Sequence, residues 1–228
     1  MEYVVSDSGG RELRTGRVRT RVYRDREPGQ SIQQAINNAA EGAIICLSAG
    51  TFDEKLKINK GITLRGAGRE QTNMKSIELK LDATILIVAD AEIEVSIESL
   101  SILATDATYA YGVEARGMAK VTILDSRISG HERGGLYVTD SAQLRLTNSR
   151  ISSNGNVGLE VSDSGQVNLT NSQVVDNRLV GLLVHGYSRV SLTDSQVSGH
   201  YLEGIAVVGA GQVSLTNSQV SSNLRWYS

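Results

Sequence analysis

The sequence predicts an all-β chain that folds as a single-stranded parallel β-helix, a β-solenoid with coils of 23 residues, and three observations lead to this fold class. Glycines recur at a constant spacing of 23 residues, at Gly112, Gly135, Gly158, Gly181 and Gly204. Within each repeat, apolar residues alternate with polar ones in three short runs, as strands require and helices do not. Glycine, serine, asparagine and aspartate fill the gaps, as in tight turns. A repeat of this length indicates a stacked solenoid.

The alternating runs also predict which side chains form the core. In one repeat the apolar residues are Leu159 and Val161 on the first strand, Val167 and Leu169 on the second, and Val174 on the third. Equivalent residues of neighbouring coils should stack roughly 4.8 Å apart along the axis. We therefore expect one continuous aliphatic core along the repeats.

Two polar columns keep the same spacing between the second and third strands. Asparagine and aspartate tolerate a left-handed backbone, so the first column is expected to bend the chain sharply at this corner. The serine column that follows it can link neighbouring coils through hydroxyl hydrogen bonds. The Asx column is Asp125, Asn148, Asn171, Asp194 and Asn217, and the serine column is Ser126, Ser149, Ser172, Ser195 and Ser218.

The N-terminal part of the chain does not follow the repeat. Residues 1–30 are expected to form an N-terminal strand and cap segment, and residues 31–228 the solenoid. Arginines alternate with other residues from Arg17 to Arg21, but acidic residues interleave them, so a charged edge strand is favoured over a nucleic-acid arm. Helical spacing from Ser31 to Ala40, with Ser31 as N-cap, predicts a short helix that covers the first coil.

Composition restricts the partners and the cellular location. The net charge of −2 gives no indication of nucleic acid or of an anionic membrane surface as a partner. No apolar run reaches membrane-spanning length, and residues 1–10 carry no signal region. The chain as given is therefore expected to be cytoplasmic, with an extracellular location left open if a leader has been trimmed.

The start of the solenoid resembles a known family. The succession Ser31–Ile36, Ile44–Leu47, Ala49–Phe52, Ile62–Leu64 and Gly66–Gly68 resembles the start of pectate-lyase-like right-handed parallel β-helix proteins, and the repeats resemble the Asn-ladder coils of that superfamily. The resemblance implies a right-handed solenoid with a polysaccharide groove along the first strand. It implies no single activity, because the superfamily includes lyases, hydrolases, esterases, epimerases and non-catalytic binding modules.

The first strand and the turn before it carry the most varied exposed residues of the repeat. Glu114, Tyr137 and Glu160 are expected to point outward from successive first strands. The preceding turns add charged, amide and aromatic side chains. The candidate ligand-binding residues of these turns are His131, Arg133, Asn156, Arg178, His200, Tyr201 and Glu203.

The acidic residues of the repeats form two candidate pairs for catalysis or cation binding. Glu114 and Glu160 lie two coils apart, about 9.6 Å, near the upper limit for an inverting glycosidase. Tyr137 stands between them, which favours ligand contact or solvated surface. Asp140 and Asp163 stack on adjacent coils, but glycines occupy the same column elsewhere, which favours a backbone role over cation binding. Catalytic residues stay unassigned.

No cofactor is expected, and Ca²⁺ enters only under a lyase interpretation. His131, His185 and His200 are single residues in different columns or well-separated coils, so the sequence predicts no metal site.

Three hypotheses for the function follow. The first is a non-catalytic recognition module that binds carbohydrate or a protein partner along the first-strand face. The second is a polysaccharide-active enzyme, a uronate lyase or epimerase or a glycoside hydrolase, with residues in the irregular coils from Gly66 to Tyr111. The third is a structural solenoid fragment of a longer chain. Because the repeat stops abruptly, end-to-end self-association at the C-terminal coil is also expected, unless Leu224, Trp226 and Tyr227 cover that end.

Overall fold

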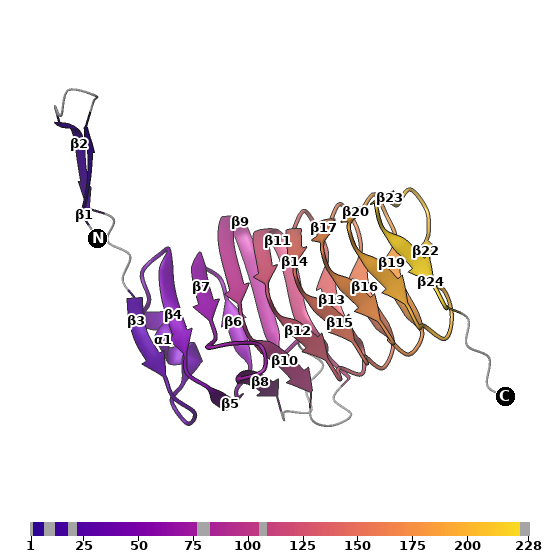
Figure 1. The fold of residues 1–228 in the computed structure, drawn as a ribbon, viewed down its shortest axis with the longest axis horizontal. Coiled ribbons are helices and arrows are strands. Elements are labelled where there is room, and N and C mark those ends of the chain that lie inside the picture. Colours follow the sequence, from indigo (N-terminus) through magenta and orange to yellow (C-terminus); the bar gives the residue numbers. More distant parts are fainter. Residues whose placement is uncertain (1, 7–11, 18–21, 77–82, 105–108, 224–228) are drawn as a thin grey trace.

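The computed structural model describes residues 2–6, 12–17, 22–76, 83–104 and 109–223. From residue 22 onward, the described residues form a parallel β-helix whose coils stack from α1 and β3 at one end to β22–β24 at the other (Figure 1). Strands β1 (Glu2–Ser6) and β2 (Glu12–Arg17) form a separate antiparallel pair. The predicted all-β solenoid is confirmed.

Each regular coil contributes one strand to each of three columns, and every strand pairs in parallel with its equivalent 23 residues away. The first column contains β13 (Gly134–Val138), β16 (Val157–Val161), β19 (Val180–Val184) and β22 (Ile205–Val207). The second contains β14 (Gln143–Thr147), β17 (Gln166–Thr170), β20 (Arg189–Thr193) and β23 (Gln212–Thr216). The third contains β12 (Arg127–Ser129), β15 (Arg150–Ser152), β18 (Gln173–Val175), β21 (Gln196–Ser198) and β24 (Gln219–Ser221).

The coils before Gly134 are less regular. Two long strands, β9 (Ile85–Glu98) and β11 (Tyr111–Leu124), run through both the first and the second column and pair with each other. The third column continues through β10 (Ser101–Ala104), β8 (Thr72–Ser76) and β5 (Gly50–Asp53). The remaining strands are β3 (Val22–Arg26), β4 (Ala43–Leu47), β6 (Leu56–Ile58) and β7 (Ile62–Arg65).

The helix α1 (Ile32–Asn38) lies at the N-terminal end of the solenoid. Ser31 is its N-cap, because the Ser31 hydroxyl accepts a hydrogen bond of 3.0 Å from the backbone N–H of Gln34. Ile32, Ala35 and Ile36 are fully buried, so the apolar stripe of the helix faces the solenoid interior. The predicted capping helix is confirmed, two residues shorter at its C-terminal end than its pattern suggested.

The predicted core is confirmed. Leu159, Val161, Val167, Leu169 and Val174 are all buried and belong to one cluster that extends through the solenoid. Alternate residues of each strand point inward, so the second strand β17 shows the burial pattern expected of a half-buried strand.

The two polar columns behave as their chemistry predicts. All five residues of the Asx column have φ between 47° and 50°, the left-handed region that asparagine and aspartate tolerate. In the serine column, the backbone N–H of each serine donates to the hydroxyl of the serine one coil later, at 3.0–3.2 Å from Ser126 to Ser218. Each of these hydroxyls donates in turn to the carbonyl two residues earlier.

A second, buried ladder explains the glycine repeat. The turn before each first strand contains an inward amide or imidazole, at His131, Asn154, Asn177, His200 and Asn223, and the backbone N–H of each donates to the side chain of the next. This Asn/His ladder packs against the glycine column. A Cβ atom on Gly158 would lie 2.7 Å from the Asn177 amide nitrogen and 2.6 Å from a methyl group of Val174. The glycines recur because the ladder leaves no room for a side chain.

Candidate functional site

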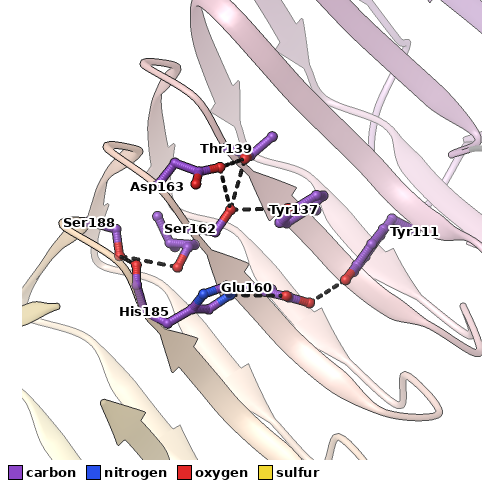
Figure 2. Close-up of polar contacts among 9 residues, drawn as sticks. Tyr111, Tyr137, Thr139, Glu160, Ser162, Asp163, His185 and Ser188 are labelled. Carbon is purple, nitrogen blue, oxygen red and sulfur yellow. Dashed lines mark hydrogen bonds and ion pairs between the residues drawn. The ribbon is translucent and has the colours of Figure 1, made fainter. Parts of the chain in front are cut away.

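The candidate site is a network of side chains that crosses the first-strand face (Figure 2). Tyr111 begins β11, Tyr137 lies on β13, Glu160 on β16, and His185 directly follows β19, so the network spans four successive coils. Tyr137 and Glu160 are register partners on adjacent strands. We call Arg133, Tyr137, Glu160 and His185 the first-strand site, together with the buried Tyr111 that contacts Arg133, Tyr137 and Glu160.

Glu160 is the centre of this site. One carboxylate oxygen accepts a hydrogen bond from the Tyr111 hydroxyl, and the other lies 3.2 Å from Nε2 of His185. The Glu160 side chain is 19% exposed and the His185 side chain 37% exposed. Both carboxylate oxygens are therefore engaged, and the imidazole is held at the surface in a defined orientation.

An aromatic and cationic layer adjoins Glu160. The rings of Tyr111 and Tyr137 stack with their centroids 5.0 Å apart, and the Arg133 guanidinium lies 4.7 Å from the centroid of the Tyr111 ring. Burial, together with the hydrogen bond to Glu160, raises the pKa of Tyr111 well above its usual value. The Tyr111 hydroxyl therefore stays protonated and acts as a donor. Only Tyr137 of the stacked pair is partly exposed.

A second cluster continues from Tyr137 towards the turn after the first strand. The Tyr137 and Ser162 hydroxyls are 3.0 Å apart, Ser162 donates to Thr139 at 2.8 Å, and Thr139 donates to the Asp163 carboxylate at 2.5 Å. The hydrogen bond from Thr139 lowers the pKa of Asp163, which keeps this exposed carboxylate ionised.

The backbone interpretation of Asp140 and Asp163 is confirmed. Both have positive φ, 57° and 54°, and the residues of the same column in other coils are Gly117, Gly186 and Gly209 with φ of 70–72°. Asp140 also accepts a hydrogen bond of 2.9 Å from the backbone N–H of Gly117. Among the residues that the structure describes, no group of three or more His, Cys, Asp or Glu side chains is placed to hold a metal ion.

The prediction of an exposed Glu114 side chain is wrong. It was expected to contact ligand or solvent, but it is 3% exposed and forms an ion pair with Arg116. Glu114 therefore cannot serve as an open carboxylate opposite Glu160.

The prediction that His131 and His200 contact a ligand is also wrong. Both were predicted to contact ligand from the turns, but both are buried members of the Asn/His ladder. They are 69 residues apart, three steps of the repeat, and so share one column rather than being isolated. At His200 a ring nitrogen accepts the backbone hydrogen bond that an amide oxygen accepts at Asn154 and Asn177, so histidine can replace asparagine in this column. The 23-residue spacing was the signal that identifies this column.

The other candidates lie apart from the first-strand site. Arg178 is exposed and lies 3.9 Å from Glu132, Asn156 is half-buried, and Tyr201 and Glu203 are exposed in the turn before β22. The structure thus brings together Arg133, Tyr137 and Glu160 from the predicted set. Sequence reasoning missed the contributions of Tyr111, Thr139, Ser162 and His185, of which the last three share a column at the 23-residue step. Parts of the irregular coils, residues 77–82 and 105–108, lie outside the described residues.

We expect the buried His131 to make stability depend on pH. Burial lowers the pKa of His131 from 6.5 to about 4, so the unfolded chain takes up a proton that the folded chain excludes between these values. This contribution to stability is complete above pH 6.5 and is lost as the pH falls towards 4. Urea unfolding at a series of pH values should show the loss.

The matched variant is His131→Asn, which introduces the residue type found in the ladder at Asn154 and Asn177 and removes the titrating ring. It should flatten the pH dependence of stability between 6.5 and 4 relative to the parent chain. An identical slope in both proteins would contradict the assignment of this titration to His131.

No helix within the described part of the chain is long and apolar enough to cross a membrane. This agrees with the lack of an apolar run of that length in the sequence.

Comparison with known proteins identifies the family. A family model for right-handed beta helix regions matches residues 60–220, whereas no curated protein matches the chain. Among solved structures, the mannuronan C-5 epimerase AlgE4 A-module of Azotobacter vinelandii is 18% identical, with TM-score 0.52, over 85% of this chain and 73% of that one. An alginate lyase from Paenibacillus sp. is 16% identical, with TM-score 0.55, over 84% and 93% of the two chains. The pectin methylesterase PemA from Erwinia chrysanthemi is 12% identical, with TM-score 0.56, over 87% and 86%. These likenesses share the fold, and the match to more than half of the chain shows that the protein belongs to the right-handed β-helix family.

Proposed function

We propose that the first-strand site binds a polysaccharide chain lying along the solenoid axis, and that the protein is a non-catalytic recognition module. The observation that carries the proposal is the partly exposed run of Tyr137, Glu160 and His185 on successive coils. Because coils repeat at about 4.8 Å, these groups face a linear ligand at regular intervals.

The chemistry of the site suits sugars. The partly exposed Tyr137 offers a combination of apolar ring and hydroxyl that suits contact with a sugar ring. Glu160 and His185 supply acceptor and donor groups beside it, and Arg133 adds a cation. Solved structures of similar fold are named for enzymes of pectin, alginate and mannuronan, which supports a polysaccharide over other linear ligands.

A polysaccharide-active enzyme is the second candidate, and one contact favours it. The imidazole of His185, 3.2 Å from a Glu160 oxygen, is oriented as a proton-transfer group requires. The engagement of both Glu160 oxygens and the protonated Tyr111 favour the binding role, because neither group is left as a free base.

The variant Tyr137→Ala with Glu160→Gln should weaken binding at least about tenfold, which corresponds to roughly 1.4 kcal/mol, because it removes the ring and the charged acceptor together. Binding is measured on a glycan array and then by calorimetry with the glycans that bind. The control is Arg145→Ala with Asn168→Ala, two outward residues of the second strands.

Equal binding by the parent chain and the first-strand variant would remove this face as the binding site. A parent chain that retains no glycan on the array would remove the polysaccharide proposal altogether. Release of unsaturated or shortened products from a uronate polysaccharide, lost in His185→Gln, would replace the binding module with the enzyme.

We also propose that the C-terminal end of the solenoid pairs with a second copy of the chain. Within the described residues, β22, β23 and β24 each have a strand neighbour on one side only. Val207, Leu215 and Val220 are 47%, 49% and 41% exposed, whereas their register partners in the preceding coil are at most 1% exposed. This end therefore exposes strand edges and core residues together.

A second copy is the partner that fits. At the other end, the apolar stripe of α1 is buried, so that end does not offer the exposed core residues of the last coil for head-to-tail stacking. The C-terminal end of a second molecule has the same three strand edges. A two-fold axis would place the C-terminal ends of the two molecules against each other, so that their strand edges face one another. Residues Leu224, Trp226 and Tyr227, expected as an alternative cover, lie outside the described residues.

We expect the chain to sediment as a dimer at micromolar concentration and the variant Leu215→Lys with Val220→Lys as a monomer, because charges on the exposed end oppose its burial. Tyr187→Lys with Gln166→Lys adds the same charges on exposed sides of the solenoid and should stay dimeric. A monomeric parent chain at every concentration would contradict the proposal.

A further inference from the structure

A polar groove lies on the opposite corner of the coil from the first-strand site. It follows the corner between the second and third strands and has a volume of about 740 Å³. Its floor is the Asx column, and one wall is the Arg/Gln column of the third strands, Arg127, Arg150, Gln173, Gln196 and Gln219. The loop residues Arg69 and Glu70 form part of its rim.

The groove presents the same pair of groups on every regular coil. Each residue of the Asx column is followed two positions later by an arginine or a glutamine, and the strand register keeps both columns aligned. Donors and acceptors therefore repeat along the axis at about 4.8 Å. A ligand that complements this array must be linear, extended and repetitive.

The rim is held in place. The Arg69 guanidinium donates to the backbone carbonyl of Asn148 at 3.2 Å, and Ser101 donates to the carbonyl of Arg69 at 2.6 Å. On the wall, Arg150 donates to the Gln173 amide oxygen at 2.6 Å, and Arg127 lies 3.8 Å from Glu70. These contacts order the polar groups before any ligand arrives, which lowers the entropic cost of binding.

The charges of the groove cancel. Its lining contains three arginines, Arg69, Arg127 and Arg150, and three acidic residues, Glu70, Asp125 and Asp194. A nucleic acid requires a clear excess of positive charge, and an acidic polysaccharide would meet as much repulsion as attraction. The electrostatics therefore favour a neutral ligand.

The lining also excludes the common modes of peptide binding. Every residue that lines the groove is charged, an amide or a serine, so an amphipathic helix would find no apolar surface. The third strands β12, β15, β18 and β21 are paired on both sides, so a peptide cannot add as a further strand. Hydroxyl groups, which both donate and accept, match the alternating amides, carboxylates and guanidinium groups.

We infer that this groove is a second binding site, for a neutral extended glycan lying along the axis on the corner between the second and third strands. One sugar ring advances by about the thickness of one coil, so each ring meets one Asx and one Arg/Gln side chain. The site uses no residue of the first-strand site and does not depend on the function proposed for that site.

The test uses three neutral β-linked hexasaccharides, cellohexaose, mannohexaose and xylohexaose, titrated into the full chain by calorimetry. At least one should bind, and Gln173→Ala with Gln196→Ala should weaken it by at least about tenfold. The matched control removes two exposed glutamines of the second strands, Gln143→Ala with Gln166→Ala, and should bind as the parent chain does.

Failure of all three hexasaccharides to bind the parent chain would overturn the inference. Equal binding by the groove variant would overturn it too, as would a stronger groove-dependent affinity for an oligogalacturonate of the same length. The first-strand variant, Tyr137→Ala with Glu160→Gln, separates the two sites, because it should keep the hexasaccharide affinity of the groove. Loss of hexasaccharide binding in the first-strand variant alone would assign that binding to the first-strand site and also overturn the inference.

Discussion

Val167→Asp is expected to cost more than about 4 kcal/mol of unfolding free energy, enough to unfold most of the chain. Val167 is 1% exposed and points into the aliphatic core from β17. A carboxylate there would be buried without a partner, which is among the most costly single changes. Urea unfolding followed by circular dichroism measures the loss.

The neighbouring residue gives the control. Asn168 points outward from the same strand, so Asn168→Asp introduces the same carboxylate at the surface and should change stability by no more than about 0.5 kcal/mol. If Val167→Asp melts within a degree or two of the parent chain, the inward and outward assignment of the second strands is wrong.

Asn177→Ala is expected to cost about 2–6 kcal/mol, since it leaves two buried donors without a partner and each costs roughly 1–3 kcal/mol. Asn177 is fully buried, and its amide oxygen accepts hydrogen bonds from the backbone N–H of Asn154 at 3.1 Å and from the Asn154 amide at 2.8 Å. Alanine removes the acceptor of both. Equilibrium unfolding in urea gives the difference in stability.

Asn177→His should recover part of this loss, because an imidazole already serves as the acceptor at His200, one coil later. The order of stability expected is the parent chain, then Asn177→His, then Asn177→Ala. A histidine variant no more stable than the alanine variant would show that the ladder stabilises by packing and not by its hydrogen bonds.

The repetitive part of the fold could be predicted because one constraint recurs. The same 23-residue step places Val167 in the core, Asn171 at a left-handed corner and Ser172 in a hydroxyl ladder. The role predicted for a position in one coil can therefore be checked against the equivalent positions of the other coils. Apolar alternation alone would have fixed only the strands. The spacing fixed which strands are neighbours.

The site could be predicted only in part, because it depends on contacts between side chains of different coils. Tyr137 and Glu160 follow from the column. Tyr111, however, begins a strand after the irregular residues, and its hydroxyl reaches Glu160 two coils later. Glu114 is buried and forms an ion pair with Arg116, and no spacing rule specifies either feature.

The two histidines illustrate a different limitation. His131 and His200 share a column with Asn154 and Asn177, and the step of the repeat identifies this relation. Histidine and asparagine differ in chemical type, so their common column is easily overlooked. Both side chains can accept a hydrogen bond from a backbone N–H, and by this property the histidines and asparagines belong to one column.

The serine column and the Asn/His ladder give the solenoid a direction. In both, the backbone N–H of one coil donates to a side chain of the coil that follows, from Ser126 to Ser218 and from His131 to Asn223. Each coil thus depends on its successor to protect these amides from exchange with solvent. Because strands in the regular part of the solenoid pair only with the equivalent strands of the adjacent coils, exchange of these ladder amides should begin in the last described coil and move back one coil at a time. Among the described coils, the amides of the earlier coils should therefore exchange more slowly than those of the last coil.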